Sequence, residues 1–168
     1  MFFNDTLIST QEEAFTAVSS FISKSSFTIV GQDLNRPWGG YFNIDESQAD
    51  TFANKFFATL IYNKTLKLSP KFLILAPGKK ISWQYHERRA ELWNVALGPV
   101  GIFRSETENM GEITIFPSGS SCEIAPLERH RLVGLENWAV VAEVWLHTNK
   151  NNPSNEEDII RLQDDYGR

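Results

Sequence analysis

The sequence predicts a mainly β protein, a β-sandwich or barrel, that carries a helical extension at its N-terminus. Three observations predict this fold class. The chain has 168 residues, which fits one domain with a substantial core. Its composition, 42% hydrophobic and 22% charged, is typical of a globular domain. Beyond residue 66, short apolar or alternating runs are separated by Gly, Pro and Ser, which is the pattern of a small β domain.

Residues 1–66 are expected to form the extension, which packs on the β domain. The run Thr10-Gln11-Glu12-Glu13 has the form of a capping box and predicts the start of a first helix. Asp45, followed three residues later by a glutamine, predicts the start of a second helix. The apolar face of this second helix would consist of Phe52, Phe56, Phe57 and Leu60. Residues 35–40, Asn-Arg-Pro-Trp-Gly-Gly, separate the two helices and are unsuitable for a helix.

Residues 67–168 are expected to form the β domain. Several short runs at this spacing, bounded by turn residues, indicate strands of a sandwich or barrel. The predicted strands are 71–76, 81–86, 92–97, 101–104, 112–116, 121–125, 130–133 and 139–147. A polar stretch follows at 149–155, and residues 156–161 are expected to form a short helix or an ordered arm.

Composition and charge exclude several classes of function. The net charge is −5 and no run is basic, so a nucleic-acid partner is not expected. The single cysteine, Cys122, rules out an intramolecular disulfide and a cysteine-rich zinc site. The start of the chain lacks the pattern of a signal peptide, and no apolar run approaches the roughly 18 residues of a membrane span. The sequence therefore predicts a cytoplasmic protein without a membrane partner.

A candidate metal site lies in the segment around residue 86. Gln84 and His86 are two residues apart, so on a strand their side chains face the same side. Glu91 opens the next strand, and His130 on a later strand can complete the set. Such nitrogen and oxygen ligands suit zinc, iron, manganese or cobalt. The alternative is that both histidines are satisfied core residues. His147 has no comparable support and is expected to be a structural or surface histidine.

The spacing of these residues resembles the first cupin motif. It reads Gly78, five residues, Gln84, one residue, His86, four residues, Glu91, six residues and a glycine, with Gln84 in place of the first histidine. The sequence around His130 resembles the second cupin motif more weakly. Leu127 replaces the usual glycine, Ala125 the usual proline and Gly134 the usual asparagine. These departures affect turns more than metal ligands.

Three motifs together resemble the type II mannose-6-phosphate isomerase family, which includes the cupin domain fused to mannose-1-phosphate guanylyltransferases. They are Arg36-Pro37-Trp38-Gly39, Gln84-x-His86-x-x-Arg89-Ala90-Glu91-x-Trp93, and the C-terminal run from Glu157 to Arg168. The resemblance implies a single cupin jelly-roll barrel (a double-stranded β-helix). It also implies a divalent metal, zinc as the first choice, and isomerisation of mannose 6-phosphate to fructose 6-phosphate through an enediol. Arg88 stands where the family often has a further histidine, so another sugar phosphate, such as a heptose phosphate, stays open.

The isomerisation requires a general base to carry a proton between two carbons. Glu143 is one candidate, because alternation along its apolar strand can place it inside the barrel, where burial would raise its pKa. Lys71, at the entrance to another strand, is the other candidate. The alternative is that these two residues form a buried ion pair without a catalytic role.

The phosphate of the substrate requires local cations, since the overall charge is negative. Arginine suits this role because its planar guanidinium binds phosphate through two hydrogen bonds. The candidates are Arg36, Arg89, Arg161 and Arg168, with Trp38 as a wall of the pocket. The alternative for each arginine is a solvated side chain or a surface salt bridge.

Two further functions stay open at this point. One is a sugar-binding cupin that keeps the pocket without catalysis, and the other is a cupin of another class, such as an iron dioxygenase. Gln84 argues against the dioxygenase, because such sites usually contain more histidines. The expected partner is a small sugar phosphate. The resemblance also suggests a homodimer, which a sedimentation measurement of one chain mass would reject.

Overall fold

A computed structural model of the chain describes residues 8–57 and 66–167. Strands dominate these residues, and helices occur only in the N-terminal third. The elements in chain order are α1 (Gln11–Lys24), β1 (Ile29–Arg36), β2 (Gly39–Ile44), η1 (Glu46–Gln48), α2 (Ala49–Phe56), β3 (Leu68–Leu75), β4 (Trp83–Tyr85), β5 (Arg89–Leu97), β6 (Val100–Ser105), β7 (Thr114–Phe116), β8 (Ser121–Ile124), β9 (Arg129–Gly134), β10 (Ala139–His147) and β11 (Ile160–Gln163).

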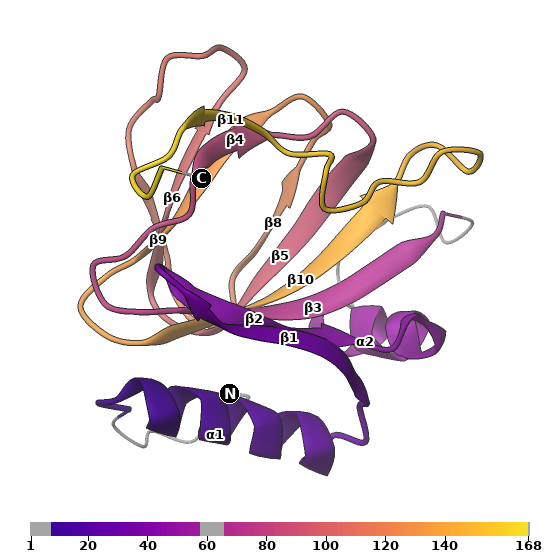
Figure 1. The fold of residues 1–168 in the computed structure, drawn as a ribbon, viewed down its shortest axis with the longest axis vertical. Coiled ribbons are helices and arrows are strands. Elements are labelled where there is room, and N and C mark those ends of the chain that lie inside the picture. The colour runs from indigo at the N-terminus through magenta and orange to yellow at the C-terminus, as the bar shows by residue number, and fades with distance from the viewer. Residues whose placement is uncertain (1–7, 58–65, 168) are drawn as a thin grey trace.

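The strands form two antiparallel sheets that curve around a common interior. Within the described residues, one sheet has six strands in the order β1-β2-β3-β10-β5-β8, and the other has five in the order β11-β4-β9-β6-β7. The two sheets close into a jelly-roll barrel, with α1 and α2 outside it, against the six-stranded sheet (Figure 1). The predicted mainly β fold with an N-terminal helix is confirmed.

The central strands β3 and β10 of the six-stranded sheet are buried almost throughout, on both faces, and this explains why β10 is almost a continuous apolar run. On the outer face, Phe72 of β3 packs against Phe52 and Phe56 of α2, at ring-centroid distances of 5.1 and 5.4 Å. On the inner face, Leu73 and Trp93 belong to a second core inside the barrel. Because side chains alternate along a strand, each of these strands contributes to both cores.

The N-terminal region agrees with the sequence in its helices, and it contains two strands between them that the sequence does not predict. Thr10 caps α1 through a capping box with Glu13, as predicted. The second helix begins just after Asp45, with η1 leading into α2, while Leu60 of its predicted apolar face lies outside the described residues. Residues 29–44, of which the sequence predicts only that 35–40 are unsuitable for a helix, form the β1–β2 hairpin, and β2 pairs with β3. Hydrogen bonding of β2 to β3 stabilises the extended conformation of this hairpin, and the local sequence does not identify β3 as the partner.

The end of the chain forms an ordered arm with a strand, β11, which is the second of the two predicted alternatives, and not a short helix. Strand β11 pairs antiparallel with β4, with Ile160 opposite Tyr85 and Arg161 opposite Gln84. The C-terminal segment is therefore hydrogen-bonded beside the first predicted metal ligand. No helix within the described residues has the length and apolarity needed to cross a bilayer.

Replacing Gly39 with alanine should strongly destabilise the fold. Gly39 has a φ of +136°, and a Cβ atom there would lie 2.0 Å from the carbonyl oxygen of Ile74. We expect a loss of at least about 2 kcal/mol, measured by urea denaturation, because strain adds to a backbone clash. Gly119 is the matched control: its φ is +85° but nothing lies within 4 Å of its Cβ position. Equal losses for Gly39→Ala and Gly119→Ala would contradict this explanation.

Candidate metal centre

The four predicted metal ligands come together inside the barrel. Gln84 lies on β4 and pairs directly with His130 on β9, while His86 follows β4 immediately. Glu91 reaches them from β5 in the opposite sheet. All four residues are buried. The two sheets thus bring together residues that are up to 46 positions apart, as the cupin spacing predicts.

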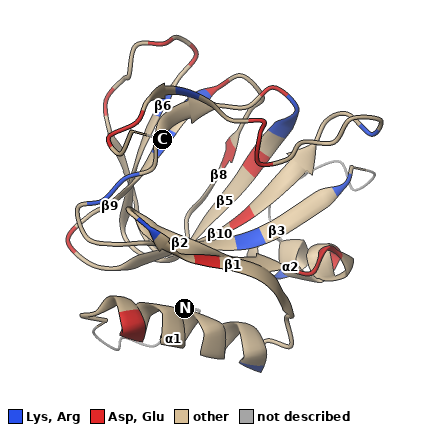
Figure 2. Ribbon diagram, in the orientation of Figure 1, with Lys and Arg blue, Asp and Glu red and all other residues tan. Residues whose placement is uncertain are grey.

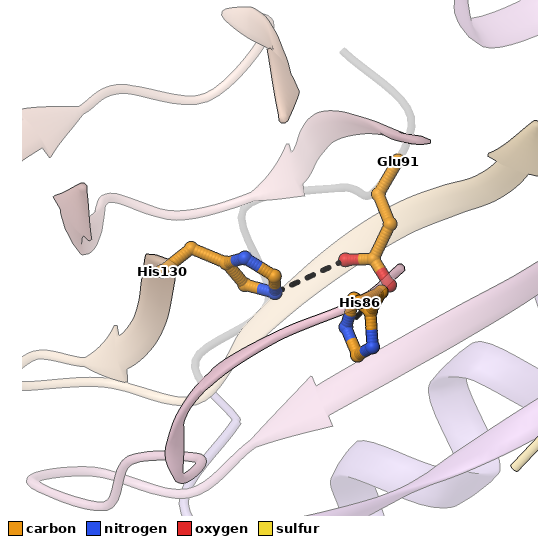
Figure 3. Close-up of side chains that lie close together, drawn as sticks. All are labelled: His86, Glu91 and His130. Carbon is orange, nitrogen blue, oxygen red and sulfur yellow. Dashed lines mark ion pairs between the residues drawn. The ribbon is translucent and has the colours of Figure 1, made fainter. Parts of the chain in front are cut away.

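The carboxylate of Glu91 lies between the two imidazole rings (Figure 3). His86 Nε2 is 3.1 Å from Glu91 Oε1, and His130 Nε2 is 3.4 Å from Glu91 Oε2. One ligand atom from each of the three residues lies within 4.8 Å of the others. Burial alone would raise the pKa of Glu91, but His86 and Arg89 outweigh it and hold that pKa well below its usual range.

Both histidines turn Nε2 toward Glu91. The Nδ1 atom of His86 lies 2.5 Å from the carbonyl oxygen of Asp158, and Nδ1 of His130 lies 2.9 Å from that of Glu128. A carbonyl oxygen only accepts, so each Nδ1 must carry a proton. Burial lowers the pKa of His130 to about 4, which keeps this ring neutral at pH 7.

These residues fit a divalent cation. Glu91 Oε2 and His130 Nε2 are both buried and have no hydrogen-bond partner. Two acceptors that face each other without a donor are unfavourable, whereas a metal ion between them would satisfy both. Two imidazole nitrogens and one carboxylate are suitable ligands for zinc and other first-row metals.

Gln84 lies at the same point, but its amide nitrogen faces the histidine. Gln84 Nε2 is 3.4 Å from His86 Nε2, and Gln84 Oε1 accepts a hydrogen bond from the Ser82 hydroxyl at 2.5 Å. Rotation of the amide by half a turn would direct the oxygen to a metal. The Ser82 hydroxyl would then accept from the amide nitrogen, since a hydroxyl both donates and accepts.

Arg89 occupies a position that the sequence does not indicate. Its side chain is buried against the ligands: Nε donates to Glu91 Oε1 at 2.8 Å and Nη2 donates to His86 Nε2 at 3.1 Å. The guanidinium also stacks on Trp145, 3.6 Å from the ring centroid, and its Nη1 donates to Ser154 Oγ at 2.9 Å. His86 Nε2 can therefore bind a metal only when Arg89 Nη2 releases it.

A pocket opens from the ligands toward the C-terminal segment. Charged positions of both signs occur on the neighbouring strands β3, β10 and β5 (Figure 2). Three of the predicted phosphate-binding arginines and Trp38 are among its lining residues, whereas Arg168 lies outside the described residues. Two of the predicted metal ligands, Gln84 and Glu91, and both candidate bases, Lys71 and Glu143, line the same pocket. Its lining also includes residues that the sequence does not suggest: Tyr41, Trp145, Glu156 and Ile159.

The predicted general base, Glu143, lies on the wall of this pocket. Its two carboxylate oxygens accept hydrogen bonds from the indole nitrogens of Trp93 and Trp145, at 2.9 and 3.0 Å. Burial and the nearby charge of Glu91 raise the pKa of Glu143 to about 8. Lys71 Nζ is 3.9 Å from Glu143 but 3.1 Å from Glu156, so its closer ion pair is with the C-terminal segment.

The raised pKa of Glu143 predicts a specific dependence of stability on pH. The folded protein keeps a proton up to about pH 8 that the unfolded chain releases near 4.5, so stability falls as pH rises between these values, by at most about 1.4 kcal/mol per pH unit. In chelator-treated protein, we expect Glu143→Gln to remove this fall. His130 contributes in the opposite direction, because its pKa is lowered. Urea denaturation of both proteins from pH 5 to 8 isolates the Glu143 contribution, and parallel curves would contradict it.

The predicted phosphate-binding arginines differ in their surroundings. Arg36 Nε pairs with Asp33 at 2.8 Å, and Arg89 is buried against the ligands. Arg161, on β11, is exposed at the pocket and has no ion-pair partner within the described residues. Arg161 is therefore the arginine whose charge is most readily offered to a phosphate.

His147 lies apart from the ligands. It is buried at the end of β10, and its Nε2 is 2.8 Å from the Ser69 hydroxyl, which donates to Glu46. Burial lowers its pKa to about 4. These contacts agree with the structural role that the sequence predicts.

Comparisons with known proteins agree with this geometry. The chain is 28% identical over 133 residues to the xanthan biosynthesis protein XanB of Xanthomonas campestris, covering 79% of this chain and 23% of that protein. It is 29% identical over 140 residues to a mannose-1-phosphate guanylyltransferase of Salmonella montevideo, covering 83% of this chain and 24% of that protein. A similar match, at 26% identity, is to the mannose-1-phosphate guanylyltransferase ManC of Salmonella typhimurium. The chain thus spans about a quarter of the length of these relatives.

Solved structures with the same architecture include oxalate decarboxylase OxdC of Bacillus subtilis. Its TM-score is 0.56 at 14% identity, covering 79% of this chain and 30% of that one, which supports the fold alone. No model of a known protein family matches the chain. The two sheets and these sequence matches show that the chain has the cupin fold and is homologous to the cupin region of ManC and XanB.

Proposed function

We propose that the protein is a metal-dependent sugar-phosphate isomerase that converts mannose 6-phosphate to fructose 6-phosphate. The observation that carries this proposal is the buried His86, Glu91 and His130 cluster beside a carboxyl group, Glu143, that titrates near neutral pH. Aldose–ketose isomerisation needs a Lewis acid or a fixed donor to stabilise the enediolate oxygen, and a general base to carry the proton. The similarity to mannose-1-phosphate guanylyltransferases supports a mannose phosphate as the substrate.

The metal would be held by His86, Glu91 and His130, with Gln84 as the fourth ligand. When bound, it would stabilise the negative charge that develops on the oxygen of the enediolate. Zinc is the first choice among the metals that suit this mixture of ligands. The residues around it exclude water, since all four ligands are buried.

Glu143 would move the proton. The carboxylate takes the proton from C2 of the aldose and returns it to C1, while the proton of the C2 hydroxyl passes to the oxygen on C1, so that the ketose forms without a net change in protonation. A carboxyl group whose pKa is about 8 exchanges protons readily at neutral pH. Lys71 is the alternative base, but its ammonium pairs with Glu156 and lies 3.7 Å from the centroid of the Trp145 ring.

The phosphate would bind at the mouth of the pocket. Arg161 offers an exposed guanidinium there, and Lys71 and Arg36 add positive charge on the opposite sheet. A role for Arg168 stays a proposal that rests on the C-terminal motif. Trp38 would contribute an apolar wall against which a sugar ring can pack.

Incubation of zinc-loaded protein with mannose 6-phosphate tests the proposal, and we expect fructose 6-phosphate to form. A panel of other hexose and heptose phosphates tests the substrate, because the Arg88 position leaves it open. Metal analysis before the assay confirms loading. The absence of turnover with every sugar phosphate, in protein that contains metal, would contradict the isomerase.

A second candidate function is a sugar-phosphate-binding cupin without catalysis. The position of Arg89 favours it, because this guanidinium already contacts Glu91 and His86 and supplies a positive charge at the site. Such a protein would be stabilised against heat by mannose 6-phosphate in the presence of a chelator and would not turn it over. Stabilisation that requires metal and accompanies turnover would instead favour the isomerase.

A further inference from the structure

The two histidines of the metal centre are oriented in different ways. His130 donates through Nδ1 to the backbone of Glu128, two residues away on its own turn. His86 donates through Nδ1 to the carbonyl oxygen of Asp158, which is 72 residues further along the chain. The orientation of His86 therefore depends on the C-terminal segment, whereas that of His130 is set locally.

The side chain of Asp158 ties that segment to the loop that follows His86. Its Oδ1 accepts from the backbone N–H of Glu87, and its Oδ2 accepts from that of Arg88, both at 3.1 Å. The Ser154 hydroxyl donates to Oδ2 at 2.6 Å. Only 3% of the Asp158 side chain is exposed, so these bonds are shielded from water. One residue thus contacts His86 through its backbone and the next two residues through its carboxylate.

The pairing of β11 with β4 places Asp158 at this loop. Ile160 lies opposite Tyr85, so the residues before β11 run alongside those after β4. The same segment also binds Arg89, through Ser154 Oγ at 2.9 Å and the carbonyl oxygen of Asn155 at 3.2 Å. The C-terminal segment therefore holds His86 and Arg89, two of the side chains that contact Glu91.

We propose that Asp158 is a positioning residue for the metal centre. Its carboxylate fixes the loop after His86, so that its carbonyl oxygen keeps His86 in the Nδ1–H form with Nε2 directed at Glu91. Partners of this kind fix both the tautomer and the ring orientation of a metal-binding histidine. The inference rests on the metal site of the proposed function and is independent of the substrate.

The test compares Asp158→Asn with the control Asp165→Asn. Asp165 lies on the same segment and pairs with Lys80 and Arg131, at 2.7 and 3.3 Å. Cobalt affinity is measured by competition with a chelator. We expect Asp158→Asn to weaken binding about 10- to 100-fold, the range for such partners, and Asp165→Asn to change it less than about 3-fold.

A second measurement reads the histidine directly. Long-range proton–nitrogen NMR of the metal-free proteins distinguishes the two tautomers of His86. We expect the Nδ1–H form in the wild type and in Asp165→Asn, and a mixture in Asp158→Asn. A general loss of stability, which the melting temperatures monitor, would not change the tautomer of a folded protein.

The outcomes separate this inference from the proposed function. If the wild type binds cobalt and Asp158→Asn binds it equally well with an unchanged tautomer, the inference is overturned and the proposed function is not affected. A wild type that binds no cobalt would overturn the metal site and the inference together. If Asp158→Asn does not fold, Ser154→Ala removes one of the hydrogen bonds to the Asp158 carboxylate, together with the bond that Arg89 Nη1 donates to Ser154, and it should weaken cobalt binding by a smaller factor. Unchanged affinity in that variant would overturn the inference.

Discussion

Replacing Glu91 with glutamine should abolish metal binding and strongly destabilise the protein. The carboxylate faces both histidines and also pairs with Arg89 Nε at 2.8 Å, and both partners of this ion pair are 2% exposed. Removing one member of a buried ion pair leaves the other charge uncompensated, which costs about 3–5 kcal/mol. The loss of the anionic ligand should remove measurable metal binding, and with it the proposed isomerase activity.

Urea denaturation and metal analysis measure these two effects separately. Glu46→Gln is the control, because Glu46 pairs with Lys67 where both side chains are about half exposed, and such pairs contribute at most about 1 kcal/mol. If Glu91→Gln is too unstable to purify, His130→Ala tests the ligand set while the Arg89–Glu91 pair is retained. Full metal content in either variant would refute the proposed ligands.

Replacing Arg161 with alanine should raise the KM for mannose 6-phosphate by about 10- to 100-fold and change kcat much less. A hydrogen bond to a charged group contributes about 1.5–3 kcal/mol, which corresponds to this range. Arg161 lines the pocket from β11, directly opposite Gln84 in the register of the sheet. It would bind the part of the substrate that does not react, so its contribution should be the same in the ground state and the transition state.

Arg104→Ala is the matched control for this variant. Arg104 also lies on a strand of the five-stranded sheet, but it pairs with Glu128 at 2.6 Å and is not among the residues that line the pocket. Steady-state kinetics of both variants, with inorganic phosphate as a competing ligand, measure the effect. An unchanged KM in Arg161→Ala would place the phosphate elsewhere, and an equal rise in both variants would indicate a general effect of charge.

The convergence of the metal ligands could be predicted from strand alternation together with the resemblance to the cupin motif. Gln84 and His86 share one side of the chain through the two-residue alternation of a strand. The cupin spacing implies that Glu91 and His130, which lie on different sheets, meet Gln84 and His86. In the structure these four side chains lie together. Alternation also explains why Glu143 points into the barrel from an otherwise apolar strand, where it lines the pocket.

The contacts that surround these ligands could not be predicted in the same way. Arg89 is expected from its motif to reach a phosphate, but in the structure it is buried against Glu91 and His86. The β1–β2 hairpin and strand β11 exist because distant strands, β3 and β4, supply their hydrogen-bond partners. Nothing in residues 29–44 or 160–163 identifies those partners, since strand formation depends on pairing more than on local propensity.

The sequence by itself determined the fold class and the residues that can hold a metal, because periodicity and spacing are properties of the chain alone. Only the tertiary structure decided how those residues are held. It placed the carbonyl of Asp158 on His86 and the guanidinium of Arg89 on Glu91, and it set the indoles of Trp93 and Trp145 on Glu143. Burial and hydrogen bonding fix tautomers and shift pKa values, and both depend on neighbours that the folding of the chain brings together.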